Sequence, residues 1–260
     1  ISSFNGHTDL VMGNVLGSNI FNVAAILGVS AIFKPLVVKR NTTWLEIPFN
    51  FLIISVLFVL TADIWFNTGE NVVRRGDGII LLCFFIIFLI YNIELALKGS
   101  DDFDEIEDSL SNGKALLFFV IGLIGLVIGG KLIVDNAVEL ALSFGISERV
   151  VGLTVVSIGT SLPELAASIV AVRKGKVDLA VGNVIGSNIF NLCLVLGTSA
   201  VINDIPVPEN SNFDIYFNIV LGFVLFSFVF VGKRRRINRP EGIILALIYI
   251  AYTVHLVMGV

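Results

Sequence analysis

Two nearly identical polar stretches interrupt a chain that is otherwise strongly apolar. "GNVLGSNIFN" occupies residues 13–22 and "GNVIGSNIFN" occupies residues 182–191. In both copies Asn, Ser and Asn recur every four residues, so the three side chains share one face of a helix. The two sets are Asn14, Ser18 and Asn22, and Asn183, Ser187 and Asn191. Amide and hydroxyl oxygens can replace the water around a hard cation, so the repeated pattern predicts a cation site.

A buried carboxylate is expected beside the second copy, in "SIGTSLPELAAS" at residues 157–168. Pro163 has no N–H, which frees the carbonyl of Gly159 and predicts a break in the helix. Glu164 follows the break, and helical spacing predicts that its face also carries four hydroxyl side chains. These are Ser157, Thr160, Ser161 and Ser168.

The chemistry of this face favours calcium or sodium. A carboxylate at membrane depth is costly and usually functional, and no Lys or Arg shares the face of Glu164. Calcium binds six to eight oxygens. Zinc or copper would prefer nitrogen and sulfur ligands, yet neither His7 nor His255 lies near the polar stripes in the sequence.

The elements that must position these residues are membrane-spanning helices. The chain has 260 residues, of which 56% are hydrophobic and only 15% charged, whereas about 25% of the residues in a soluble domain are charged. Eight stretches are long enough to cross a bilayer, which takes about 20 helical residues. They lie near residues 9–32, 46–66, 78–97, 115–134, 150–172, 178–202, 214–232 and 241–259. We therefore expect an all-α, multi-pass integral membrane protein.

The polar copies belong to a longer internal repeat of opposite orientation. Residues 9–32 and 178–201 share 15 identities in 24 positions, and the five predicted spans between the copies invert one relative to the other. Assigning alternate loops to alternate sides puts 13 Lys and Arg on one side and three on the other. This bias indicates that the basic side is cytoplasmic and that the C-terminus faces outward. Inverted repeats are typical of secondary transporters, which bind their substrate near the bilayer midplane.

The acidic segment "DDFDEIEDSLSNG" at residues 101–113 lacks the ligand order of an EF-hand, which needs Gly at the sixth position and Glu at the twelfth. It is interpreted as a solvated linker. The predicted organisation is the remainder of a first inverted repeat at 1–97, an acidic cytoplasmic linker at 98–114 and a second inverted repeat at 115–260.

"GTSLPE" followed by "GNVIGSNIFN", with an inverted "GNVLGSNIFN", resembles the alpha-repeats of the calcium/cation antiporter superfamily, especially the prokaryotic sodium/calcium exchangers. The resemblance covers the whole chain. It implies two inverted five-span halves, ten spans in all, with the ion site between the second, third, seventh and eighth. On that pattern Ile1 lies near the end of the second span, and the family's earlier residues are expected upstream.

The resemblance also implies roles for individual residues. Glu164 would bind calcium and sodium, and its neighbours would add neutral oxygens. These neighbours are Thr160, Ser161, Ser18, Ser187, Asn22 and Ser157, the last through its backbone carbonyl. Some members of the family have Asp where this chain has Asn191, which leaves the number of coupled ions open. Asn191 is retained as a candidate ligand.

The function expected from these features is calcium/sodium exchange by alternating access, with proton/calcium or other cation antiport as the alternative. An enzymatic activity such as that of an intramembrane hydrolase is not expected, because Ser161 has no His or Lys on its face to activate it as a nucleophile. No cofactor is expected. The expected partners are the two ions and the lipid bilayer, without nucleic acid or an obligatory protein. The expected location is a prokaryotic plasma membrane. A lone carboxylate under-compensates a divalent ion, so a second acid is expected about six residues upstream of Ile1.

Overall fold

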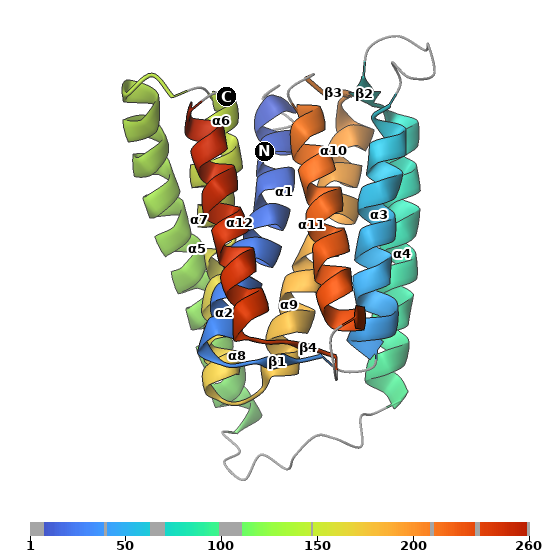
Figure 1. Ribbon diagram of the computed structural model, residues 1–260, viewed down its shortest axis with the longest axis vertical. Coiled ribbons are helices and arrows are strands. Elements are labelled where there is room, and N and C mark those ends of the chain that lie inside the picture. The colour runs from blue at the N-terminus through green and yellow to red at the C-terminus, as the bar shows by residue number, and fades with distance from the viewer. Residues whose placement is uncertain are drawn as a thin grey trace.

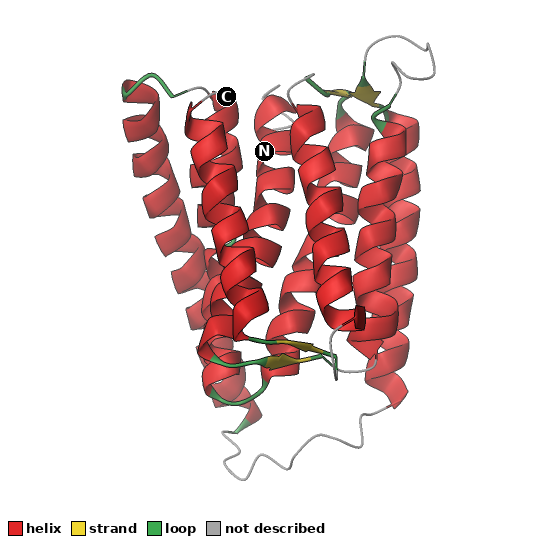
Figure 2. Ribbon diagram, viewed as in Figure 1, coloured by secondary structure: helices red, strands yellow, loops and turns green. Residues whose placement is uncertain are grey.

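The computed structural model describes residues 8–38, 41–62, 71–98, 111–146, 148–208, 211–231 and 235–258. Within these ranges seven helices are long and apolar enough to cross a membrane. A pair of helices bent by 51°, Gly152–Thr160 and Leu162–Arg173, supplies an eighth span. The eight predicted spans and the all-α fold class are therefore confirmed, and the spans stand side by side as one bundle (Figures 1 and 2).

The first part of the chain forms three spans. The first is continuous through α1 (Thr8–Ile20), the π-helical segment η1 (Phe21–Leu27) and α2 (Gly28–Phe33). After strand β1 (Leu36–Val37), the second contains η2 (Thr42–Glu46) and α3 (Ile47–Leu60). Strand β2 (Val72–Val73) then leads into α4 (Arg75–Lys98).

The second part forms five spans. Helix α5 (Asn112–Ser143) precedes the bent span, which consists of α6 (Glu148–Val151), η4 (Gly152–Val156), α7 (Ser157–Thr160) and α8 (Leu162–Arg173). The next span contains α9 (Val177–Phe190), η5 (Asn191–Leu196) and α10 (Gly197–Ile202). Strand β3 (Ile205–Pro206), α11 (Ser211–Val231), β4 (Arg236–Ile237) and α12 (Arg239–Met258) complete the fold.

The span predicted at 115–134 ends too early, because its apolar segment continues to Ala141. Lys131 and Asp135, on either side of the predicted end at residue 134, therefore lie inside the longer helix α5. Both side chains are exposed. Of the predicted linker at 98–114, residues 99–110 lie outside the described residues, whereas Lys98 ends α4 and residues 112–114 begin α5.

The two repeated spans run in opposite directions, as the span count predicted. In Figure 1 the α1–α2 span descends and the α9–α10 span ascends. The two copies also share an interruption that was not predicted from the sequence, since η1 and η5 begin at Phe21 and Asn191, 170 residues apart. Such π-helical segments are rare and are often found at functional sites.

Two short antiparallel ladders close opposite ends of the bundle. Strand β1 pairs with β4, with Leu36 opposite Ile237, and β2 pairs with β3, with Val72 opposite Pro206. We call the end with β1 and β4 the inner end and the end with β2 and β3 the outer end (Figure 1). Basic residues near these two ends follow the predicted bias. Lys34 stands two residues before β1 and Arg173 ends α8, both of which lie at the inner end, whereas Arg74 and Arg75 follow β2 at the outer end.

The last helix of each half packs closely on the repeated span of the other half. A β-carbon on Gly242 of α12 would lie 2.7 Å from the Gly28 carbonyl oxygen, and one on Gly78 of α4 would lie 2.7 Å from the Gly197 carbonyl oxygen. Only glycine permits such close backbone contact between membrane helices.

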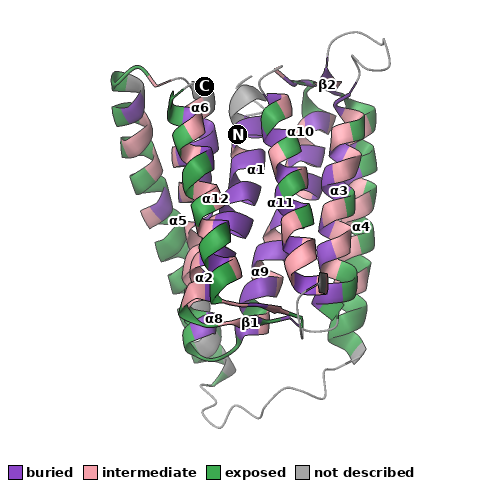
Figure 3. Ribbon diagram, viewed as in Figure 1, coloured by how far each residue is buried: buried purple, intermediate pink, exposed green. Residues whose placement is uncertain are grey.

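Burial separates a protein-packed centre from a lipid-exposed periphery. In the most apolar part of the first span 83% of the residues are buried, against 6% in the span formed by α4. Figure 3 accordingly shows α1 as largely buried and α4 as largely exposed at the edge of the bundle. The first repeated span therefore faces mainly other helices, whereas half of the most apolar part of the second, Val177–Ile202, is buried.

Candidate functional site

The segment before the bend packs on the first polar stripe. The Thr160 hydroxyl donates to Asn14 Oδ1 at 2.9 Å and lies 3.2 Å from Ser18 Oγ. Ser157 Oγ donates to the Asn14 carbonyl oxygen at 3.3 Å, and Ser18 Oγ donates to the Ser157 carbonyl oxygen at 3.4 Å. These bonds join α1 to α7 by hydroxyl, amide and carbonyl groups.

The segment after the bend packs on the second polar stripe. Ser187 Oγ donates to Glu164 Oε1 at 3.2 Å. Asn183 Nδ2 donates to the Glu164 carbonyl oxygen and to Ser168 Oγ, both at 3.3 Å. Glu164 is thus held against α9 through its side chain and its backbone.

This division corrects one sequence-based prediction. Ser157, Thr160 and Ser168 were expected on one continuous face with Glu164. In the structure Ser157 and Thr160 bond to α1, whereas Glu164 and Ser168 bond to α9. The 51° bend between Thr160 and Leu162 is the physical reason. Ser161 lies buried at this bend, and its N–H donates to the Ser157 carbonyl oxygen at 3.2 Å.

Four asparagines form a pseudo-symmetric cluster between the two repeats. Asn19 Nδ2 donates to the Asn188 carbonyl oxygen at 3.4 Å, and Asn188 Nδ2 donates to the Asn19 carbonyl oxygen at 3.3 Å. Asn22 Nδ2 donates to Asn188 Oδ1 at 2.9 Å, while Asn191 Nδ2 donates to Asn19 Oδ1 at 3.2 Å. Each residue and its equivalent are 169 positions apart, so the same bonds are made twice about an internal two-fold axis.

Two buried oxygens in these clusters have no hydrogen-bond partner among the described residues. They are Glu164 Oε2 and Asn22 Oδ1. The Asn22 amide oxygen can only accept hydrogen bonds, and so can the oxygens of an ionised Glu164. Buried acceptors without partners are costly. A cation would satisfy both oxygens. Among the described residues no group of three or more His, Cys, Asp or Glu could hold a metal.

Asn19 and Asn188 were missed because they fall outside the four-residue stripes. Their presence in both copies of the repeat was the signal that could have identified them. The stripes themselves supply Ser18, Asn22, Ser187 and Asn191, which the structure brings into the clusters described above.

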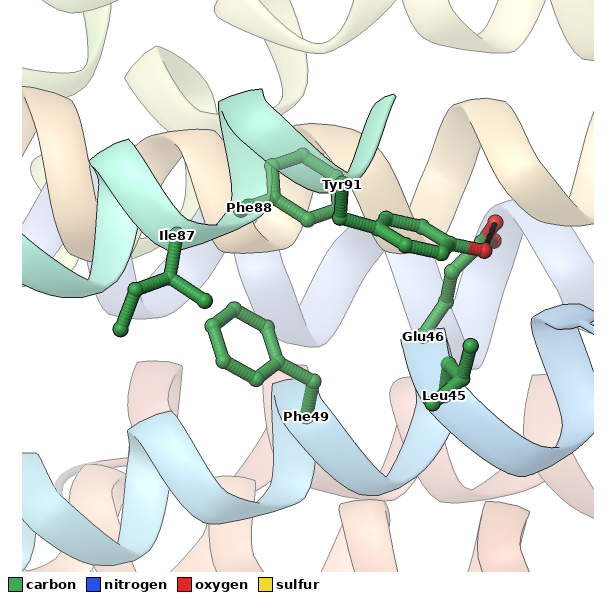
Figure 4. Close-up of a pocket in the computed structure, with 6 residues that line it drawn as sticks. All are labelled: Leu45, Glu46, Phe49, Ile87, Phe88 and Tyr91. Carbon is green, nitrogen blue, oxygen red and sulfur yellow. Dashed lines mark hydrogen bonds between the residues drawn. The ribbon is translucent and has the colours of Figure 1, made fainter. Parts of the chain in front are cut away.

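A second carboxylate, Glu46, was also missed. Tyr91 of α4 donates to Glu46 Oε1 at 3.5 Å, and the two residues line an apolar pocket with Phe49, Ile87 and Phe88. Leu45 completes its lining, and Figure 4 shows the tyrosine hydroxyl directed at the carboxylate. Glu46 Oε2 lies 3.9 Å from the position of a β-carbon on Gly182. A single acid in an apolar span was the signal in the sequence.

An inverted pair of interrupted helices around an oxygen-rich polar centre defines a secondary-transporter architecture. The sodium/calcium exchanger protein family model matches residues 1–94 and 114–258. The chain belongs to the sodium/calcium exchanger protein family, which is a family of exchangers, and it is a multi-pass membrane protein.

Individual relatives match nearly the whole chain. The inner membrane protein YrbG of Escherichia coli (strain K12) is 35% identical over 94% of this chain and 76% of its own length. The sodium/calcium exchanger MaX1 of Methanosarcina acetivorans is 31% identical over 94% of this chain and 79% of its own length. The structure also resembles the sodium-calcium exchanger NCX_Mj soaked with 2.5 mM Na+ and 10 mM Sr2+, with a TM-score of 0.77, 32% identity and coverage of 97% of this chain and 79% of that one.

Proposed function

We propose that this protein exchanges calcium for sodium across the membrane by alternating access, and that the ions bind between the two repeated spans. Glu164 supplies the negative charge. The other proposed ligands are the side chains or backbone oxygens of Thr160, Ser161, Asn22, Asn191, Ser18, Ser187 and Ser157. The two inverted halves proposed at 1–97 and 115–260 would then contribute one polar span each.

The pair of unpartnered buried oxygens, Glu164 Oε2 and Asn22 Oδ1, is the observation that carries this proposal. The Ser187 hydroxyl already donates to Glu164 Oε1, and the Asn22 side-chain nitrogen already donates to Asn188 Oδ1. The remaining oxygen of each side chain is therefore available to a cation without breaking an existing bond.

Neutral ligands suit a site that must also be empty during part of the cycle. Amides and hydroxyls can replace water around calcium or sodium, and they leave no uncompensated charge in the membrane when the ion departs. One carboxylate is still too little charge for a buried divalent ion.

The experiment is calcium uptake into sodium-loaded liposomes that contain the full-length protein. Glu164→Gln keeps the size of the side chain and one oxygen but removes its charge. Removing one member of a buried charge pair costs about 2–5 kcal/mol, so we expect a loss of calcium affinity of at least about 30-fold. The matched control is Glu139→Gln on α5, where the side chain is exposed.

Uptake by Glu164→Gln at the parental rate and affinity would refute the proposed site. Replacing the sodium gradient by a pH gradient in the same liposomes tests the coupling ion. Uptake driven by the pH gradient and not by sodium would instead identify a proton/calcium antiporter.

A further inference from the structure

A cavity at the inner end lies between two spans that carry the polar clusters, but away from those clusters. Ser30, Phe33 and Lys34 line it from the α2 side, and Ile169, Val172 and Arg173 line it from α8. Two cationic side chains, one hydroxyl and three apolar side chains thus face the same space. In the described part of the chain neither Lys34 nor Arg173 forms an ion pair.

The hydroxyl provides a second, independent observation. Ser30 is only 2% exposed, and its Oγ has no hydrogen-bond partner among the described residues. A helical serine commonly bonds the carbonyl four residues earlier, so this buried and unpaired hydroxyl requires a different explanation. Ser30 lines the cavity that the two cations also line, and a change of its side-chain rotamer would let the hydroxyl donate to an anionic oxygen there.

The helix end itself does not require the lysine. The equivalent of Lys34 in the other repeat, 169 residues later, is Asn203. Both residues are extended, with φ of −149° and −140°, and both donate their N–H at 3.0 Å to the serine carbonyl four residues earlier. The two repeats therefore end this helix in the same way, one with a lysine at this position and the other with an asparagine.

We propose that this cavity binds the phosphate group of an anionic phospholipid of the inner leaflet. Lys34 and Arg173 compensate the charge of the phosphate, and Ser30 donates a hydrogen bond to it. Basic pockets between helices on the cytoplasmic side are suited to anionic lipid headgroups. Phe33, which is 71% exposed, and the apolar wall of α8 favour a lipid over a free phosphate ion, because the acyl chains supply an apolar neighbour.

A lipid bound here would join two elements of the proposed ion site. Helix α2 continues the span that carries Ser18 and Asn22, and Arg173 ends the helix that begins beside Glu164. Lys34 Nζ already reaches the turn after α8, where it lies 3.5 Å from the position of a β-carbon on Gly175. The phosphate would hold the inner ends of α2 and α8 together.

The test is titration of phosphatidylglycerol into the full-length protein in a neutral detergent, with bound lipid counted by native mass spectrometry. The double variant Lys34→Gln/Arg173→Gln is compared with Lys174→Gln/Lys176→Gln, which loses the same charge from exposed positions in the adjacent turn. We expect the affinity for the first bound lipid to fall about 10-fold or more in the cavity variant, because each basic residue contributes about 1 kcal/mol. The control should change less than about 2-fold.

Ser30→Ala tests the geometry without changing the charge. A lost hydrogen bond predicts an affinity about 2- to 10-fold weaker, whereas Ser55→Ala, whose hydroxyl bonds the Phe51 carbonyl oxygen, should bind like the parent. Lipid should also raise the melting temperature of the parent but not of the cavity double variant. The melting temperatures without lipid show that each variant is folded.

Three results would overturn the proposal. Equal losses of phosphatidylglycerol affinity in the two double variants would show that only the overall positive charge matters, and not the cavity. Parental affinity in Ser30→Ala would show that the hydroxyl does not contact the lipid. Full displacement of phosphatidylglycerol by millimolar inorganic phosphate would assign the cavity to a free ion instead.

Discussion

Asn22 Nδ2 donates to Asn188 Oδ1 at 2.9 Å, and the pseudo-symmetric bond joins Asn191 Nδ2 to Asn19 Oδ1 at 3.2 Å. The four side chains connect the two repeats at the point where each helix becomes π-helical. The bonds use the amide nitrogens of Asn22 and Asn191, so both residues can be fixed in position while Asn22 retains an unpartnered oxygen.

Asn22→Leu and Asn191→Leu should both reduce sodium-driven calcium uptake. Each change removes a side-chain oxygen that is proposed to bind the ion. Each also removes a hydrogen bond to the other repeat, from Asn22 to Asn188 Oδ1 or from Asn191 to Asn19 Oδ1. The measurement is the calcium dependence of uptake in liposomes, with Asn136→Leu on α5, an exposed position, as the control. If Asn191→Leu transports like the parent, the motif serves helix packing and Asn191 is not a ligand.

Ser187→Ala should weaken calcium binding without unfolding the protein. It removes the 3.2 Å hydrogen bond to Glu164 Oε1, and a bond to a charged group is worth about 1.5–3 kcal/mol. We expect a calcium affinity about 10- to 150-fold lower, measured by calorimetry on the full-length protein. Ser143→Ala, an exposed serine that bonds only a nearby carbonyl oxygen in α5, provides the comparison. An unchanged affinity in Ser187→Ala would separate this hydroxyl from the ion site.

Gly242→Val should lower the melting temperature. Its β-carbon would meet the Gly28 carbonyl oxygen at 2.7 Å and the Ala31 β-carbon at 2.8 Å, and overpacking typically costs about 1–3 kcal/mol. Gly122→Val on α5 makes the same chemical change where no atom lies within 4 Å. Thermal unfolding in detergent should distinguish them, and equal melting temperatures would mean that the α12 contact with α2 tolerates a side chain.

Tyr252→Phe should also destabilise the protein, by removing a hydrogen bond between α12 and α11. The Tyr252 hydroxyl donates to Asp214 Oδ1 at 2.9 Å, and both residues are almost fully buried. A lost bond to a carboxylate costs about 1.5–3 kcal/mol. Tyr216→Phe makes the same change at a side chain that is 40% exposed. Equal stability of the two variants would show that the buried bond contributes nothing measurable.

Hydropathy and the internal repeat were sufficient to predict the spans and their inversion. Membrane helices satisfy their own backbone groups, so long apolar segments such as the one before Lys98 have few alternative structures. Boundaries were less reliable where a helix tolerates charges. Lys131 and Asp135 belong to the interior of α5 for this reason.

The site was predicted in its residue types and only partly in its geometry. Pro163 indicated the break, but the spacing rule that placed Thr160 and Glu164 on one face assumes a straight helix. The asparagine bonds between Asn19 and Asn188 depend on how two helices 169 residues apart pack together. No local pattern contains that information. Whether the predicted ligands bind the ion stays a prediction.

The two terminal ladders have a consequence for biosynthesis. Leu36 pairs with Ile237 and Val73 pairs with Ile205. Each of the early strands β1 and β2 is therefore synthesised well before the strand with which it pairs. Segments emerge from the ribosome at about 5–20 residues per second, and the 201 residues from Leu36 to Ile237 therefore require roughly 10–40 seconds. During this interval the surface of α2 around Gly28, which Gly242 of α12 contacts in the folded protein, lacks that partner. Translational pauses or a membrane chaperone acting before α12 emerges should therefore affect the yield of folded protein more than changes made after it.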